Sequence, residues 1–104
     1  MASLSTHVLD TSRGQPAQGI RVSLESAAGE RLAEGTTDAD GRVSPLGPET
    51  LEPGEYLVRF DTGGYLGADA FYPEVVVHFV AEGDQHYHVP LLLNPFGYST
   101  YRGS

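Results

Sequence analysis

The sequence contains no cysteine, so it can form no disulfide framework and thiol chemistry is excluded. No apolar run approaches the roughly 20 residues that a membrane-spanning helix needs. The first residues also lack the basic and apolar segments that are typical of a signal peptide. We therefore expect a soluble, cytoplasmic protein that has no membrane partner.

Basic residues are few, because six Lys and Arg stand against fourteen Asp and Glu, and the net charge is −8. Nucleic acid and anionic membranes would repel such a chain, so neither is an expected partner. The 104 residues are enough for one domain, residues 1–104, with a single core. A chain of this size buries roughly two-thirds of the surface that it exposes when unfolded.

Thirteen glycines and seven prolines divide the chain into short segments, and no segment has a convincing helical period. Alternating apolar and polar residues predict strands instead, as at residues 20–25 and 56–60. Residues 62–70 are expected to hold at most one short helix, because their glycines oppose a longer one. Regular short strands separated by turns predict an all-β protein, a sandwich of two sheets.

Residues 75–80 are apolar on nearly both faces of the predicted strand. Such a strand can lie at the edge of a sheet, where it would invite pairing with another chain. It can equally be a central strand that is covered on both faces. The sequence leaves both possibilities open. Further strands are predicted at residues 42–46, 85–94 and 96–102.

Titratable side chains occur on predicted strands at both ends of the chain. Successive side chains of a strand point to opposite faces, so His86 and His88 share one face of theirs. The alternate residues of that strand are uniformly apolar and belong to the core. By the same alternation His7 points outward with Ser5 and Leu9, whereas Thr6 and Val8 suit the core. In the last strand Tyr98 and Thr100 are predicted on the core side.

If these three strands share a sheet, then His7, His88 and Tyr101 meet on its outer face. The middle of the chain, residues 19–60, resembles many non-catalytic β-sandwich modules, such as the regulatory domain beside some carboxypeptidases. Judged on those residues alone, a structural or binding module would be the better interpretation. The two ends of the chain, with their histidines, instead favour a functional site.

Four motifs carry a more specific resemblance: Leu-Ser-Thr-His-Val-Leu-Asp-Thr-x-x-Gly-x-Pro-Ala at residues 4–17, Asp-Gly-Arg at 40–42, His-Tyr-His-Val-Pro-Leu-Leu-Leu at 86–93, and Tyr-Arg-Gly-Ser at 101–104. Together they resemble the 5-hydroxyisourate hydrolases of the transthyretin-related protein family. The similarity covers almost the whole chain. The terminal Tyr-Arg-Gly-Ser is the motif that separates these hydrolases from the vertebrate hormone carriers.

The resemblance implies a transthyretin-like (prealbumin-like) sandwich that forms a homotetramer, a dimer of dimers, with its sites in a central channel. It implies hydrolysis of 5-hydroxyisourate to 2-oxo-4-hydroxy-4-carboxy-5-ureidoimidazoline in urate degradation, a part of purine catabolism, without metal or organic cofactor. Carried over by position, the catalytic residues are His7, Arg42 and His88. Substrate binding is assigned to His7, Arg42, Tyr101 and Ser104.

Within that site, a neutral imidazole suits the removal of a proton from water, because its ordinary pKa lies near 6.5. We expect His88 to be the general base and His7 to position the water or the substrate. Arg42 would bind the carbonyl-rich substrate, stabilise developing negative charge and lower the pKa of a nearby imidazole. Tyr101 would close the site and donate a hydrogen bond.

Other interpretations remain for the same residues. The whole chain can be a non-catalytic ligand carrier resembling transthyretin, or a structural module. His7 taken alone resembles a surface histidine, and His86 with His88 resembles a metal-binding pair, although no third ligand is evident. His78, within an apolar strand, suits packing or an interface. Arg102 suits an ion pair with an acidic neighbour.

Overall fold

The computed structural model describes residues 3–48, 51–83 and 85–103. Nearly all regular structure in these residues is β. The strands are β1 (Ser3–Asp10), β2 (Gln15–Pro16), β3 (Arg21–Ser26), β4 (Arg31–Thr36), β5 (Arg42–Val43), β6 (Gly54–Phe60), β7 (Val75–Ala81), β8 (His86–Asn94) and β9 (Gly97–Thr100). One short helix, α1 (Thr62–Leu66), is followed by a 3-10 turn, Gly67–Asp69.

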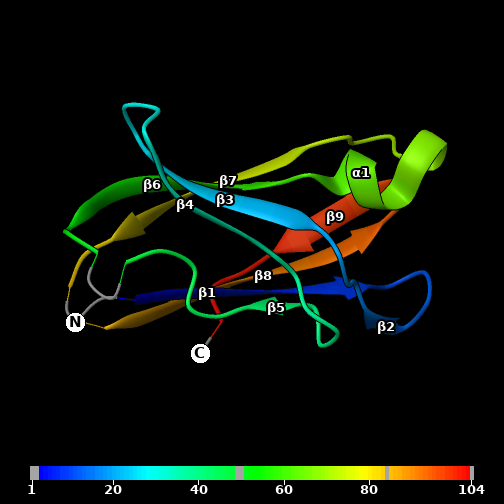
Figure 1. Cartoon of the computed structure of the whole chain (residues 1–104), viewed down its shortest axis with the longest axis horizontal. Coiled ribbons are helices and arrows are strands. Elements are labelled where there is room, and N and C mark those ends of the chain that lie inside the picture. The colour runs from blue at the N-terminus through cyan, green and yellow to red at the C-terminus, as the bar shows by residue number, and fades with distance from the viewer. Residues whose placement is uncertain (1–2, 49–50, 84, 104) are drawn as a thin grey trace.

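The strands form two layers (Figure 1). One sheet has the order β2-β1-β8-β9, with β5 also paired to β1, and the other has the order β4-β3-β6-β7. The predicted all-β sandwich of two sheets with one short helix is therefore confirmed. Of the described helices, none has the length and apolar character needed to cross a membrane.

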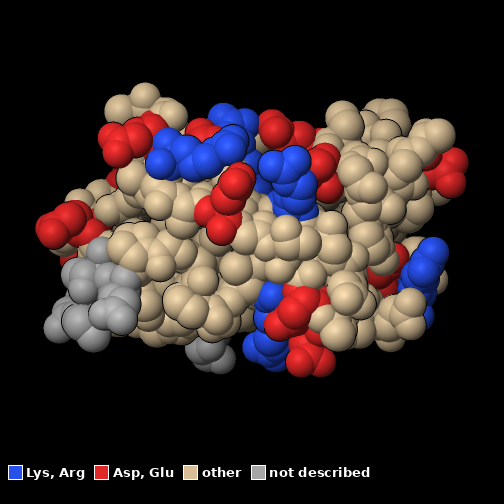
Figure 2. Space-filling view, in the orientation of Figure 1, with Lys and Arg blue, Asp and Glu red and all other residues tan. Residues whose placement is uncertain are grey.

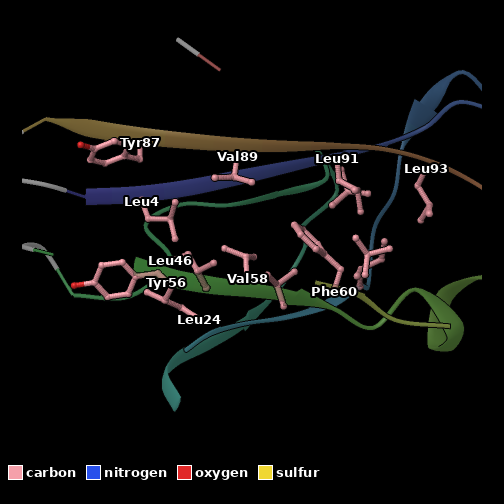
Figure 3. Packing of buried hydrophobic residues seen from close by; sticks show 14 of the residues in the cluster. Leu4, Leu24, Leu46, Tyr56, Val58, Phe60, Tyr87, Val89, Leu91 and Leu93 are labelled. Atoms are coloured by element: carbon pink, nitrogen blue, oxygen red, sulfur yellow. The ribbon is translucent and has the colours of Figure 1, made fainter. Parts of the chain in front are cut away.

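The core lies between the two sheets and is made by alternate residues of the strands (Figure 3). Leu91 and Leu93 of β8 face Val58 and Phe60 of β6 across this layer, and all four are almost completely buried. This is the alternation that the sequence predicts for residues 56–60 and 86–93. The opposite face of each strand is therefore free to carry polar side chains.

Strand β7 lies at the edge of its sheet, so the edge interpretation of the apolar segment is correct. Among the described strands, its one neighbour is β6. Val76 and Val80 point away from the core and are 38% and 54% exposed, whereas Val75 is buried. An apolar strand is thus left with one unpaired side, which is the usual setting for association with another chain.

Two predicted strands are several residues shorter in the structure, and one burial pattern differs from the prediction. The strand predicted at residues 42–46 ends at Val43, because Pro45 has no N–H to continue a ladder. The strand predicted at 96–102 extends only from Gly97 to Thr100. Tyr98 and Thr100 do lie beside Leu93 and Leu91, on the core side as predicted, yet both are exposed. They are exposed because β9 is the edge strand of its sheet, where the other layer covers less of it.

Helix α1 is attached to the end of β1 through a buried carboxylate. Asp10 is 2% exposed, and its Oδ2 accepts a hydrogen bond of 2.7 Å from the Tyr65 hydroxyl. Its Oδ1 accepts from the hydroxyl and the amide of Ser12, at 2.6 and 3.0 Å, and from the amide of Arg13 at 3.2 Å. Burial would raise the pKa of Asp10, but these hydrogen bonds outweigh it and hold the pKa below 3.8.

Candidate functional site

The candidate site lies on the outer face of the sheet that contains β1 and β8. These strands are parallel, and their register pairs Ser3 with His86 and Ser5 with His88. Thr6 and Val8 are completely buried on the core side, whereas His7 and His88 are half-buried. The predicted outward direction of the histidines is therefore confirmed.

Arg42 reaches the same face through a tight turn that begins at Asp38. The Asp38 carboxylate Oδ1 accepts hydrogen bonds from the amides of Asp40 and Arg42, at 2.9 and 3.0 Å. Gly41 closes the turn with a φ of +75°, which glycine adopts without strain. The turn starts β5 at Arg42, directly opposite His7 in the antiparallel register. Opposed Cβ atoms of such a pair are about 4.5–5.5 Å apart.

His88 is the centre of this group. Burial lowers the pKa of its imidazole below 6.5, and electrostatic interactions with Arg42, His7 and His86 lower it further. Because the guanidinium is always charged, it disfavours a second positive charge beside it. The neutral imidazole therefore predominates at neutral pH, and it can accept a proton.

Two serines of β1 connect the histidines of β8. Ser5 Oγ lies 2.8 Å from His88 Nδ1 and 2.8 Å from His86 Nε2, while Ser3 Oγ lies 2.6 Å from His86 Nδ1. The Nε2 atom of His88 is the nitrogen left for a water or a substrate. Sequence reasoning placed Ser5 on the outer face but missed these contacts. The missing signal was the β1–β8 register, which individual strand patterns do not contain.

The chain returns to His88 after β9. The Gly103 amide donates a hydrogen bond of 2.9 Å to the His88 carbonyl. A Cβ added at Gly103 would lie only 2.5 Å from His88 Cδ2, so glycine alone allows this approach. Ser104, a predicted substrate-binding residue, lies outside the described residues.

Tyr101 and Arg102 belong to the same C-terminal tail, the residues that follow β9, but their side chains have different surroundings. Tyr101 is 59% exposed and lines the same hollow as His88. The Arg102 guanidinium donates to Gln85 Oε1 at 2.9 Å and lies over the Tyr87 ring, 5.2 Å from its centroid. Among the described contacts, Arg102 thus binds an amide and an aromatic ring, while its predicted ion pair with an acidic neighbour stays a prediction.

A hollow of about 280 Å³ touches one side of this region. It opens between the edge strands β7 and β9 and is lined by His88, Tyr101, Arg102 and apolar residues that include Val80 and Phe79. His7 and Arg42 are not part of its lining. On one chain the face that joins His7, Arg42 and His88 is thus an open sheet surface.

The opposite sheet has a different character. Figure 2 shows acidic and basic side chains interleaved over the layer that contains β3, β4 and β6. There Arg59 contacts Glu25 at 2.7 Å and Glu74 at 2.9 Å. His78 of β7 is exposed, with its Nε2 2.8 Å from Glu55 Oε1, far from the other three histidines in the fold. Within the described ranges, His, Cys, Asp and Glu form no cluster of three or more suited to a metal.

Comparison with known proteins adds independent information. The chain is 48% identical over 109 residues to the 5-hydroxyisourate hydrolase of Salmonella typhimurium, a match that covers 97% of this chain and 80% of the relative. It is 44% identical to the 5-hydroxyisourate hydrolase of Caulobacter vibrioides, with both chains fully covered. The structure of Klebsiella pneumoniae 5-hydroxyisourate hydrolase superimposes with a TM-score of 0.91 at 40% identity, over 100% of this chain and 94% of the other.

The fold is also that of transthyretin. Sea bream transthyretin in complex with thyroxine superimposes with a TM-score of 0.86 at 35% identity, and covers 96% of this chain and 93% of the other. The model of the HIUase/Transthyretin family matches residues 4–103, which is nearly the entire sequence. The chain therefore belongs to the HIUase/Transthyretin family.

Proposed function

We propose that this chain is a single hydrolase domain that opens the ring of 5-hydroxyisourate to give 2-oxo-4-hydroxy-4-carboxy-5-ureidoimidazoline in urate degradation. The observation that carries the proposal is full-length identity of 44% to a named hydrolase, together with His7, Arg42 and His88 on one sheet face. The reaction is hydrolysis of a cyclic amide. Water adds to a ring carbonyl, the adjacent C–N bond breaks, and the departing nitrogen takes a proton.

In this mechanism His88 removes a proton from the attacking water. Its lowered pKa keeps the ring neutral, and its Nδ1 is held by Ser5, so Nε2 is the basic atom. Arg42 binds the carbonyl-rich substrate and stabilises the oxyanion that forms as water adds. His7, opposite Arg42, positions the water or the substrate. None of these roles requires a metal or an organic cofactor, so we expect activity to survive treatment with a chelator.

We assign the tail to substrate binding. Gly103 anchors it against the His88 strand, which leaves Tyr101 free to close over bound substrate and donate a hydrogen bond. Ser104 is included in this assignment by its position in the Tyr-Arg-Gly-Ser motif. A chain that ends at Thr100 should fold, because the core is complete without the tail, yet it should turn over little substrate. Full turnover by that chain would remove the tail from the mechanism.

We further propose that the active form is a homotetramer, a dimer of dimers, in which a neighbouring copy covers the open face. Two features support this: the edge strands β7 and β9 carry exposed apolar side chains, and the His7–Arg42 face is unenclosed. Equilibrium sedimentation tests the assembly. A monomer that is fully active at the assay concentration would contradict the shared channel. Cell fractionation would test the proposed cytoplasmic location.

The alternative is a non-catalytic carrier like the transthyretin that superimposes on this chain. A large apolar ligand needs an apolar cavity, whereas the outer face here carries three imidazoles, two hydroxyls and a guanidinium. The face therefore favours a small polar substrate.

One assay separates the two functions. The ultraviolet absorbance of freshly generated 5-hydroxyisourate is followed with wild-type protein, with His88→Ala and with the control His78→Ala, which changes an exposed histidine on the other sheet. We expect rapid decay with wild type and the control, and decay near the uncatalysed rate with His88→Ala. Decay that wild-type protein does not accelerate would reject the hydrolase.

A further inference from the structure

Ser5 occupies an unusual position, because its one hydroxyl lies within hydrogen-bond distance of two imidazoles. The distances from Oγ are 2.8 Å to His88 Nδ1 and 2.8 Å to His86 Nε2. Ser5 itself is only 6% exposed, whereas His86 is exposed and its other nitrogen contacts Ser3 Oγ at 2.6 Å. A chain of hydrogen bonds thus runs from the candidate base to the surface.

Two arrangements of this hydrogen-bonded network place the Ser5 proton between the two imidazoles. A hydroxyl has one proton and two acceptor lone pairs, so when Ser5 donates to one imidazole it can accept a hydrogen bond from the other. In the first arrangement His88 Nδ1–H donates to Ser5, Ser5 donates to His86 Nε2, and His86 Nδ1–H donates to Ser3. In the second arrangement all three hydrogen bonds are reversed. His88 Nε2 is a free base only in the first arrangement, because Nδ1 holds the ring's single proton.

We propose that Ser5 and His86 form a proton relay that carries the proton taken by His88 to solvent, an inference that rests on the proposed hydrolysis. When His88 Nε2 takes a proton from water, its Nδ1 proton moves to Ser5 Oγ, and the Ser5 proton moves to His86 Nε2. His86 then releases its Nδ1 proton toward Ser3 and water. The three hydrogen bonds are then in the second arrangement, with the Nε2 of His88 protonated. When the C–N bond breaks, the departing nitrogen takes this Nε2 proton, and the transfers run in reverse as His86 takes up one proton from water. The proton released to solvent is thus recovered, and the first arrangement is restored.

The surroundings favour this direction of transfer. Arg42 and His7 lie on the His88 side of the relay, and their charges disfavour a proton that stays on His88. His86 is exposed, so water can stabilise a positive charge there and accept the proton. Ser5 and His86 do not bind substrate in this proposal. Ser5 is a positioning residue, and His86 is the exit of the relay.

The kinetic test compares Ser5→Ala with Ser5→Thr, which keeps the hydroxyl, and with Ser23→Ala. Ser23 is a matched control, because it is an equally buried serine, 8% exposed, in the other sheet. We expect Ser5→Ala to lower kcat about tenfold or more with KM nearly unchanged, since acid–base steps contribute factors of this order. Ser5→Thr and Ser23→Ala should retain most of kcat. Wild-type kcat in Ser5→Ala would overturn the relay.

A second variant distinguishes proton transfer from simple orientation of the ring. His86→Gln can still hydrogen-bond Ser5 but cannot take up a proton. We expect a lowered kcat that added imidazole buffer restores, together with a changed solvent isotope effect on kcat. A His86→Gln enzyme with unchanged kcat and isotope effect would overturn the exit through His86.

A measurement without substrate tests the relay independently of the proposed reaction. Nitrogen-15 NMR of the histidine rings reports which nitrogen of each ring is protonated. In wild type we expect the His86 and His88 tautomers to change together with pH, and in Ser5→Ala to change independently. Independent changes in wild type would refute the hydrogen-bonded chain. If the tautomers change together but the protein does not hydrolyse 5-hydroxyisourate, the proposed substrate would be refuted, whereas the hydrogen-bonded relay would still be supported.

Discussion

Replacing Tyr65 with phenylalanine removes a single oxygen atom from the junction between helix α1 and strand β1. That oxygen donates a 2.7 Å hydrogen bond to Oδ2 of Asp10, whose side chain is almost completely buried. Among the described residues, the remaining contact of Oδ2 is Arg13 Nε at 3.8 Å, which is too long for a hydrogen bond. In the variant, Oδ2 would therefore be a buried carboxylate oxygen without a hydrogen-bond donor.

The size of the effect follows from the charge of the acceptor. Hydrogen bonds to charged groups contribute about 1.5–3 kcal/mol, roughly twice as much as neutral ones. The aromatic ring of Tyr65 is kept by phenylalanine, so its packing is little changed. We expect Tyr65→Phe to lower the free energy of unfolding by about 2 kcal/mol at neutral pH.

Urea unfolding followed by circular dichroism measures this difference. All variants are compared at one protein concentration, since association would add to apparent stability. Tyr98→Phe is the matched control, because Tyr98 is 42% exposed and its hydroxyl has no hydrogen-bond partner among the described residues. A loss below about 0.5 kcal/mol in Tyr65→Phe, or an equal loss in the control, would refute the argument.

The pH dependence gives the same experiment a second test. The pKa of folded Asp10 lies below its ordinary value of 3.8, so the unfolded chain binds this proton first as the pH falls. The stabilisation is therefore complete above the unfolded pKa and is lost as the pH falls through the folded one. The difference between wild type and Tyr65→Phe should shrink on acidification below 3.8. A constant difference would mean that the carboxylate charge is not involved.

Three further predictions concern the site and the turn beside it. Arg42→Met removes a charge that lowers the His88 pKa, so the acid-side pKa in the pH profile of kcat/KM should rise toward 6.5. An unchanged acid-side pKa would contradict the assignment of His88 as the base. Gly103→Ala should lower kcat with little change in the free energy of unfolding, because the added Cβ would displace the His88 ring. A normal kcat would show that the ring can move without loss of activity. Gly41→Ala should destabilise the protein by at least about 2 kcal/mol in urea unfolding, because the turn has φ +75° and the new Cβ would lie 2.4 Å from the Val8 carbonyl oxygen. A fully stable Gly41→Ala would mean that the turn relaxes without cost.

Alternation of side chains explains why much of the fold was predictable. The burial of Tyr56, Val58 and Phe60, and the outward direction of His7 and His88, follow from the two-residue period of a strand. The short helix was also predictable, because the glycines at its start and end limit its length. The residues proposed for catalysis came from the motifs, and their roles stay predictions.

Pairing between strands explains what the sequence left open. Nothing within residues 75–80 reveals whether a second neighbour exists, since an apolar strand suits an edge and a centre alike. The exposure of Tyr98 likewise depends on how far the other sheet extends. The Ser5–His88 contact needed the register of two strands whose contacting residues are 83 positions apart. Such long-range pairings are decided by the packing of the whole chain.

The parallel pairing of β1 with β8 also has a consequence for biosynthesis. During translation the first strand leaves the ribosome long before the segment that becomes its central neighbour. Until then, its apolar side lacks most of the cover that it has in the finished protein. The candidate base and the turn arginine can meet only after β8 has been synthesised. A nascent chain that is released early is thus expected to depend on chaperones or to be degraded, and it cannot act on substrate prematurely.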